Sequence, residues 1–196
     1  MSIKEENEIT VKVICSKNEL LKSLVDKGFK EGRTFSLDDY YFIPNNLDIE
    51  NMTTRDIVSK SVIIRYIVNE RKIRQVITFK IKDINDNDDI INQQAINCDI
   101  YNIEEAKKLF ETIGYYEIMN IKENDIVYSK NGLELALKFI NNGEILIEIE
   151  TKPNTEWDTI EKIKNIISTL ELPIEKDKYF VKKAENELNR ILGRCQ

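Results

Sequence analysis

Glu8-Ile-Thr10-Val-Lys12 and Glu148-Ile-Glu150 are the stretches that decide the fold, because both alternate polar or charged residues with β-branched apolar ones. Successive side chains of a β-strand point to opposite faces of its sheet. Each stretch is therefore predicted to be a strand with one apolar and one charged face. The charged face either meets solvent or lines a polar cavity, and only the second arrangement provides an active site.

The composition is that of an ordinary globular protein, with 196 residues, of which 41% are hydrophobic and 33% charged. A net charge of −6 argues against a general binder of nucleic-acid polymers or membrane surfaces. The sequence shows no apolar run long enough to span a bilayer and no signal-peptide core. The widely spaced Cys15, Cys98 and Cys195 favour reduced thiols, and hence a cytoplasmic location.

The absence of histidine excludes Ser-His-Asp and Cys-His catalysis and histidine-bound metals. The sequence also lacks the glycine-rich motifs GxxxxGK[ST] and GxGxxG, which cradle phosphates in many nucleotide-binding proteins. Any phosphate chemistry would therefore depend on lysines, arginines, carboxylates and a metal ion.

The order of predicted elements occurs twice along the chain. Ser16-Lys-Asn-Glu19 is a capping box that begins a helix ending at Gly28. Asn102-Ile-Glu-Glu105 begins a second helix, which ends at Gly114. Corresponding residues of the two segments are 86 positions apart, and this constant offset indicates an internal repeat.

Strand-like segments rich in Ile, Val, Tyr, Phe and Thr surround both helices. The offset of 86 also relates Asp39 to Asp125 within them. The polar stretch 83–94 is predicted to be a loop, and 155–169 and 175–192 to be amphipathic helices. Strands are expected at about 8–15, 34–43, 61–69, 72–82, 95–101, 116–122, 125–130, 133–140 and 144–151.

These elements predict an α+β protein, an antiparallel closed barrel of about eight to nine strands with helices packed outside, built from an internal duplication. We expect a single domain over 1–196, with halves at about 8–90 and 95–152 and C-terminal helices at about 155–192. If helices cover the outside, the apolar strand residues point outward and the charged ones line a tunnel. The alternative is an ordinary antiparallel sheet with a solvated charged face.

The layout resembles the CYTH, or triphosphate-tunnel, family, which includes class IV adenylyl cyclases and thiamine triphosphatases. The resemblance runs in order and spacing from about Glu8 to Tyr179. Glu8-Ile-Thr10-Val-Lys12 is similar to the opening Glu-x-Glu-x-Lys strand of the family. The other similar pieces are Gly28-Phe29, Asp39-Tyr-Tyr41-Phe42, the strand VIIRYIV with Arg65, ITFK with Thr78 and Lys80, Gly114-Tyr115, Glu148-Ile-Glu150 and Lys178-Tyr179.

The resemblance implies a charged barrel that binds a triphosphate-containing small molecule or polyphosphate, with metal-dependent hydrolysis or adenylyl cyclase-like chemistry. It implies Mg²⁺ or Mn²⁺ held by Glu8, Glu148 and Glu150. Neither a nucleic-acid polymer nor a membrane is an expected partner, and the oligomeric state stays open, with a dimer as one option. The implied catalytic residues are Lys12, Arg65 and Lys80, and the implied substrate-binding residues are Lys12, Arg65, Thr78, Lys80, Lys82, Lys122 and Lys138.

Several positions depart from the family pattern. Thr10 replaces the second Glu of the opening motif, Ile63 replaces an Arg, and Lys138 stands where an Asp is common. Gln93-Gln94-Ala95 replaces an Arg-x-Glu strand, and the basic cluster of the sixth strand retains Lys122. These departures support a second hypothesis, a non-catalytic protein that binds a nucleotide, an anion or a partner protein and has lost the metal site.

Overall fold

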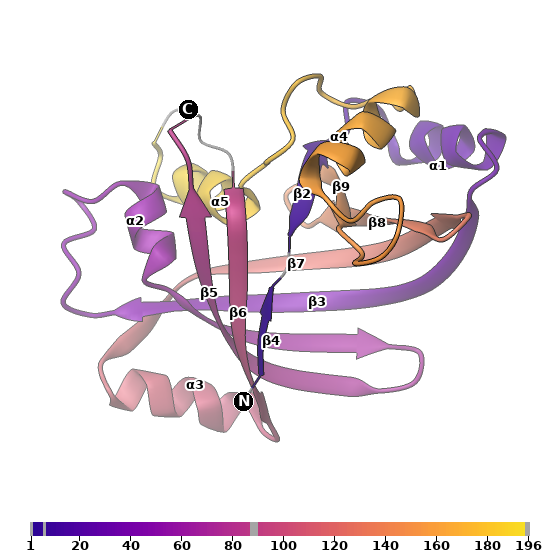
Figure 1. Ribbon diagram of the computed structural model, residues 1–196. Helices are drawn as coiled ribbons and strands as arrows, with labels where there is room; N and C mark the ends of the chain where they lie inside the picture. Colours follow the sequence, from indigo (N-terminus) through magenta and orange to yellow (C-terminus); the bar gives the residue numbers. More distant parts are fainter. Residues whose placement is uncertain (1, 6, 87–89, 195–196) are drawn as a thin grey trace.

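The computed structural model describes residues 2–5, 7–86 and 90–194 (Figure 1). Its strands form one antiparallel nine-stranded sheet in the order β1-β6-β5-β4-β3-β7-β8-β9-β2. Together with the helices, this sheet confirms the predicted α+β class. The strands are β1 Ser2–Glu5, β2 Glu8–Lys12, β3 Lys30–Pro44, β4 Val62–Asn69, β5 Ile73–Ile84, β6 Ile90–Ile100, β7 Tyr115–Lys130, β8 Leu133–Ile140 and β9 Ile145–Glu150.

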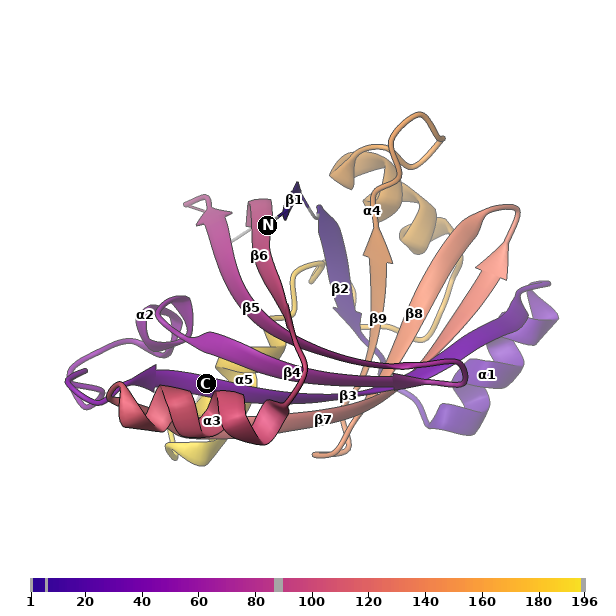
Figure 2. The same cartoon turned by 90° about the horizontal axis from the view of Figure 1, so that it is seen from below.

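The sheet is strongly curled, and helices lie against both of its faces (Figures 1 and 2). Three helices, α1, α3 and α4, pack on the convex face, whereas α2 and α5 pack on the concave face. No described helix combines the length and apolar character needed to cross a bilayer. The helices are α1 Lys17–Asp26, α2 Thr54–Ser59, α3 Ile103–Thr112, α4 Ile160–Thr169 and α5 Lys183–Ile191.

The convex face is apolar because helices cover it. Ile9 and Val11 of β2 are fully buried in a cluster that includes Leu24 of α1 and Ile163 of α4. A separate cluster joins Phe42 and other strand residues to α3. The side chains that alternate with these residues must point to the concave face. The predicted direction, with apolar side chains outward and charged ones inward, is therefore confirmed for β2.

The concave face is closed at one end by α2 and α5. Ile57 of α2 and Leu188 of α5 pack in one cluster with Tyr41, Ile63 and Leu146 of the sheet. The expectation that helices pack only outside the sheet is thus wrong for these two. Helix α2 was not predicted, because its six residues are too few for a periodic pattern, although Thr53 caps it by accepting from the Asp56 N–H.

The two edges of the sheet are occupied by strands that are neighbours in sequence. β1 pairs with β6 at one edge, and β2 pairs with β9 at the other. The free side of β2 is partly covered by the segment 179–181, since Thr10 N–H donates to the Tyr179 carbonyl and Val181 N–H to the Thr10 carbonyl, both at 2.9 Å. This pairing explains why the predicted helix 175–192 begins only at Lys183.

The offset of 86 residues recurs in the structure. Ser16 and Asn102 cap α1 and α3, and Gly28 and Gly114 follow these helices at φ +81° and +92°, in the left-handed region that glycine tolerates. Each glycine leads into a long strand, β3 or β7, and these two strands pair with each other. These elements have the order and spacing that the offset predicts, and the internal duplication itself stays a prediction.

The predicted loop 83–94 differs most from the structure, because β5 extends to Ile84 and β6 begins at Ile90. Of the polar residues that suggested a loop, Asn92, Gln93 and Gln94 belong to β6, whereas 85–86 lie outside both strands. Gln93 is buried there and donates to Glu8 at 3.2 Å. Of the cysteines, Cys15 and Cys98 are free thiols, and Cys195 lies outside the described residues.

We expect Ile9→Ala to lower the free energy of unfolding by about 2–5 kcal/mol, because it removes a fully buried side chain between β2 and the helices. Ile14→Ala is the matched control, since Ile14 is 67% exposed and should change stability by less than about 0.5 kcal/mol. Urea unfolding of both variants measures the difference. Equal effects would contradict the assignment of Ile9 to the helix-covered face.

Candidate functional site

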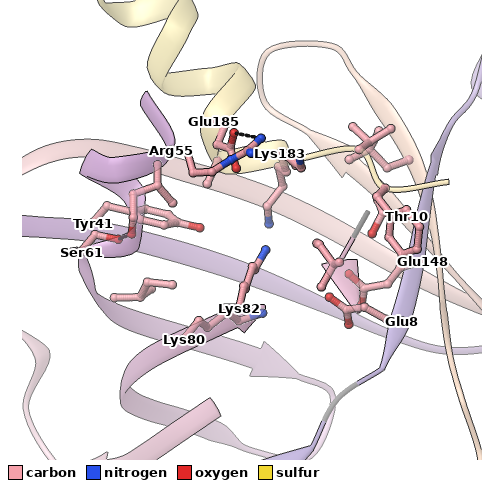
Figure 3. Close-up of a pocket in the computed structure, with 18 of the residues that line it drawn as sticks. Glu8, Thr10, Tyr41, Arg55, Ser61, Lys80, Lys82, Glu148, Lys183 and Glu185 are labelled. Atoms are coloured by element: carbon pink, nitrogen blue, oxygen red, sulfur yellow. Dashed lines mark hydrogen bonds and ion pairs between the residues drawn. The ribbon is translucent and has the colours of Figure 1, made fainter. Parts of the chain in front are cut away.

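The concave face contains a cavity of about 540 Å³, bounded by the sheet, α2 and the segment that leads into α5 (Figure 3). Its wall is formed by the side chains that alternate with the helix-covered ones. Seven cationic residues line it: Arg55, Arg65, Lys80, Lys82, Lys138, Lys182 and Lys183. Six acidic residues do so too: Glu8, Asp56, Glu123, Glu148, Glu150 and Glu185.

One side of the cavity is an acidic wall, which we define as Glu8, Glu148 and Glu150. One carboxylate oxygen from each of the three lies within 4.8 Å of the others. The register of β2 on β9 produces this cluster, because Glu8 is opposite Glu150 and Thr10 is opposite Glu148 on the same face. Burial, followed by repulsion from Glu8, raises the pKa of Glu148.

The acidic wall suits a hard divalent cation. Mg²⁺ and Mn²⁺ prefer oxygen ligands and retain waters or bind phosphate oxygens at their other positions. Three converging carboxylates therefore fit either ion. Thr10 also lines this side of the cavity, and its hydroxyl offers a neutral oxygen where the family pattern has a carboxylate.

The opposite side is a basic wall, which we define as Lys80 and Lys82 of β5. Neither ammonium forms an ion pair with any described residue. Figure 3 shows both side chains directed into the cavity, across from Glu8 and Glu148. Lys82 keeps contact with solvent through the cavity, yet enough protein surrounds it that loss of hydration, followed by repulsion from Lys80, lowers its pKa to about 8.

Arg65 is brought to the cavity but is engaged with its own chain. Its Nε and Nη2 donate to the two oxygens of Asp39 at 2.6 and 2.7 Å, a bidentate pair across β3 and β4. Although burial of Asp39 opposes ionisation, Arg65 holds the pKa of that carboxyl below its usual range. The Nη1 group of Arg65 makes no hydrogen bond to a described residue and can donate to other acceptors.

Lys138 of β8 lies at the centre of a buried cluster of carboxylates. Its Nζ is 3.3 Å from Glu123, 3.3 Å from Asp125 and 3.4 Å from Glu148. Asp125 is directly opposite Lys138 on β7, just as Asp39 is opposite Arg65. The two halves of the chain therefore each place a cross-strand pair of a cation and a carboxylate on the concave face.

Helix α5 adds a second ammonium to this cluster, since Lys183 Nζ donates to Glu123 at 2.7 Å. Burial opposes ionisation of Glu123, but Lys183 and then Lys138 lower the pKa of Glu123 to about 2. The pKa of Asp125 is shifted in the opposite direction. Burial, with repulsion from Glu123 and Glu148, raises the pKa of Asp125 to about 7, although Lys138 opposes this rise.

Seven of the predicted site residues line this one cavity: Glu8, Arg65, Lys80, Lys82, Lys138, Glu148 and Glu150. The other three lie elsewhere among the described residues. Lys12 pairs with Glu144 at 2.9 Å, and Thr78 donates to Asn97 at 2.8 Å. Lys122 is on the face of β7 opposite to Glu123 and pairs with Asp38 at 3.4 Å.

Sequence reasoning did not assign Glu123, Asp125 or Lys183 to the site. Glu123 and Asp125 continue the buried face of Met119 and Ile121 along β7, but they are flanked by the polar Lys122 and Asn124. The segment 122–125 therefore contains no alternation of charged and apolar residues that would mark them. The four polar residues at 122–125 instead suggested a break between two short strands. Lys183 had no local signal, since only the fold brings the start of α5 to the sheet.

No protein-family model matches the sequence, and no curated protein matches it. Solved structures with a similar fold do exist. The PH1819 protein from Pyrococcus horikoshii OT3 has a TM-score of 0.67 and 18% identity, covering 94% of this chain and 99% of the other. HpAC1 from Hippeastrum, a protein with a dominant triphosphatase activity, has a TM-score of 0.59 and 13% identity, covering 97% of both chains.

A candidate adenylate cyclase from Vibrio parahaemolyticus has a TM-score of 0.58 and 14% identity, covering 94% of this chain and 98% of the other. At such low identity these likenesses concern the fold alone. They extend over nearly the whole of each chain, so the shared architecture is that of the complete sheet with its helices. The predicted resemblance is confirmed at the level of the fold: the chain shares its fold with a candidate adenylate cyclase and with HpAC1.

Proposed function

We propose that the chain binds a triphosphate-containing small molecule or polyphosphate, together with Mg²⁺ or Mn²⁺, in the cavity of the concave face. Hydrolysis of a phosphoanhydride bond is the reaction that we assign to this site. The observation that carries the proposal is the placement of the acidic wall across one cavity from the two lysines of the basic wall. The triphosphatase activity of the structural neighbour HpAC1 supports the same substrate class.

In this proposal, Glu8, Glu148 and Glu150 hold the divalent cation. When bound, such an ion neutralises phosphate charge and lowers the pKa of a coordinated water. The three carboxylates bring it to the phosphate end of the ligand and leave its other positions to waters and phosphate oxygens. Without the ion, these carboxylates would repel a polyanion, so we expect binding of the anion to require the metal.

Lys80 and Lys82 are the proposed phosphate ligands, because their ammonium groups face the cavity without an ion pair to a described residue. Arg65 adds its Nη1 donors, while Asp39 fixes the guanidinium plane. Lys12, Thr78 and Lys122 are left out of the proposed site, because none of them lines the cavity.

We also propose that β1 and β2 close the sheet into a barrel and that its halves arose by duplication. Pairing of β1 with β6 and of β2 with β9 supports closure, because the two strands are consecutive in sequence. The matched pairs Asp39–Arg65 and Asp125–Lys138 support duplication. A closed barrel would exclude bulk water from the cavity and strengthen its electrostatic interactions.

A non-catalytic anion-binding protein is the second candidate. Two observations favour it: Thr10 provides no carboxylate for the metal, and Arg65 and Lys138 are already paired with carboxylates of the chain. This candidate shares the binding site of the first and differs in turnover. Phosphate release therefore separates the two.

We expect Lys80→Met to weaken binding of tripolyphosphate in the presence of Mn²⁺ by at least about tenfold, because a charge-assisted contact to phosphate is worth about 1.5–3 kcal/mol. Isothermal titration calorimetry measures the affinity. Lys122→Met removes a lysine from the other face of the sheet and should leave the affinity within about twofold. Equal losses in the two variants would show that overall charge, and not the cavity, attracts the anion.

Turnover is tested with tripolyphosphate, thiamine triphosphate and ATP, each with Mg²⁺ or Mn²⁺, by release of phosphate and formation of cyclic AMP. The hydrolytic proposal predicts phosphate release that Glu148→Gln abolishes. Binding without turnover would favour the non-catalytic candidate. An absence of both binding and turnover would overturn the proposed function.

We expect Thr10→Glu to tighten Mn²⁺ binding, because position 10 lies opposite Glu148 on the cavity face and would add a fourth carboxylate. A gain of about tenfold in affinity, with a rise in any phosphate release, is the predicted result. Thr10→Gln is the control, since it adds similar bulk without charge. Weaker metal binding in Thr10→Glu would show that residue 10 is not part of the metal site.

The lowered pKa of Lys82 predicts opposite effects on stability and binding. Below pH 8 the folded protein must carry an ammonium that has lost part of its hydration and is repelled by Lys80, so Lys82→Met should raise the melting temperature at pH 7. We expect about 2–4 °C, allowing for the solvent that reaches the group. Between pH 8 and about 10.5 the folded state has released this proton while the unfolded state retains it, so the stabilisation should fade as pH rises.

The affinity for tripolyphosphate should depend on the protonation of Lys82. In the wild type it should fall as pH rises through 8, because Lys82 loses its charge. Lys82→Met should bind more weakly at pH 7 and lack this step. Calorimetric titrations at pH 7 and 9 measure both effects, and an unchanged affinity in Lys82→Met would remove Lys82 from the binding site.

A further inference from the structure

We infer that the Lys138 ammonium is a built-in cation that occupies a second cation site beside the acidic wall, so that the chain takes up one external divalent ion. The inference rests on the proposed function, in which Glu8, Glu148 and Glu150 hold that ion. The inference goes beyond the proposed function in two respects. It assigns the number of metal ions bound, and it gives Lys138 a role other than substrate binding.

The surroundings of Lys138 are those of a bound metal ion. Oxygens of Glu123, Asp125 and Glu148 lie 3.3–3.4 Å from its Nζ, and they come from two strands, β7 and β9, on either side of β8. The Nζ of Lys138 donates to Glu123 and Asp125 and forms an ion pair with Glu148. The three carboxylates balance the ammonium charge within the chain, and a resident cation therefore explains why a lysine is buried at this position.

The cluster also has coordinating capacity that the ammonium does not use. Asp125 is 1% exposed, and its Oδ1 is buried without a hydrogen-bond partner in the described part of the chain. An unsatisfied buried carboxylate oxygen is costly beside a lysine but would be a ligand beside a divalent ion. This oxygen is the independent sign that the cluster fits a cation with more ligands than an ammonium.

The two cation sites share Glu148. One oxygen of Glu148 lies 3.4 Å from Lys138, and the same side chain belongs to the acidic wall. Two divalent ions bridged by one carboxylate would place four positive charges close together. With Lys138 in place of the second ion, the positive charge at the two sites falls from four to three. Lys183 already contributes a further positive charge at Glu123. The resident lysine therefore limits the cavity to one external ion.

Two variants separate the charge of Lys138 from its volume. Lys138→Ala removes the ammonium and leaves space for an ion among the three carboxylates. Lys138→Met removes the same charge but fills the space with an apolar side chain of similar length. Bound Mn²⁺ is counted by electron paramagnetic resonance of the free ion, and the melting temperature is recorded with and without Mn²⁺.

The expected stoichiometry is one Mn²⁺ for the wild type, two for Lys138→Ala and no more than one for Lys138→Met. Mn²⁺ should also stabilise Lys138→Ala more than the wild type, because the additional ion replaces the missing counter-charge. At a Mn²⁺ concentration about 100 times the dissociation constant of the additional site, the melting temperature should rise by about 5–10 °C more than in the wild type. Adding Asp125→Asn to Lys138→Ala should abolish the extra ion.

A wild type that takes up two ions would overturn the inference. So would a Lys138→Ala variant that binds no more Mn²⁺ than Lys138→Met, or that stays unfolded at saturating Mn²⁺. Failure of the proposed function gives a different result. A wild type that binds no Mn²⁺ contradicts the acidic wall as a metal site, while a single ion gained by Lys138→Ala would still support the resident role of Lys138.

Discussion

Burial of the convex face of the sheet under α1, α3 and α4 is the constraint on which the rest of the structure depends. These helices cover apolar strand residues such as Ile9, Val11 and Phe42, which are fully buried. Because side chains alternate along a strand, covering one face commits every second residue to the other. The polar residues thereby collect on the concave face, where curvature of the sheet brings β2 and β9 across from β5 (Figure 2).

Charges gathered in this way must neutralise one another or be neutralised by a ligand. The structure shows the first, and the proposed function adds the second. Arg65 and Lys138 are paired with buried carboxylates, and Lys183 adds to the neutralisation of Glu123. The acidic and basic walls are left to face each other across the cavity. In the proposed function, a bound divalent ion would add positive charge at the acidic wall, and the phosphates would add negative charge at the basic wall.

The period-two pattern and the helix caps predicted much of the fold. Ser16, Asn102 and the two glycines located α1 and α3 because local backbone chemistry decides these positions. Residues 83–84 and 90–94 were mistaken for part of a loop because polar residues indicate exposure to solvent unless the sheet has a polar interior. The start of α5 was misplaced because pairing of residues 179–181 with β2 is a tertiary contact that no local pattern encodes.

The site was predictable where one strand carried the whole signal, as for Lys80 and Lys82 on β5, which the cavity brings together with Glu8 and Glu148. Lys122 shows the limit of such reasoning. It was assigned to the site by resemblance, but the parity of β7 directs it away from the cavity and directs Glu123 into it. A shift of one residue along a strand exchanges its faces, so a motif transfers only when the register is known.

The central claim is that one cavity holds both a divalent ion and the phosphates that it neutralises. Anomalous diffraction from crystals soaked with Mn²⁺ and a non-hydrolysable triphosphate tests it most directly. We predict a manganese peak among Glu8, Glu148 and Glu150, with phosphate density between that peak and the ammonium groups of Lys80 and Lys82. Manganese bound only outside the cavity, or phosphates that contact neither lysine, would contradict the account.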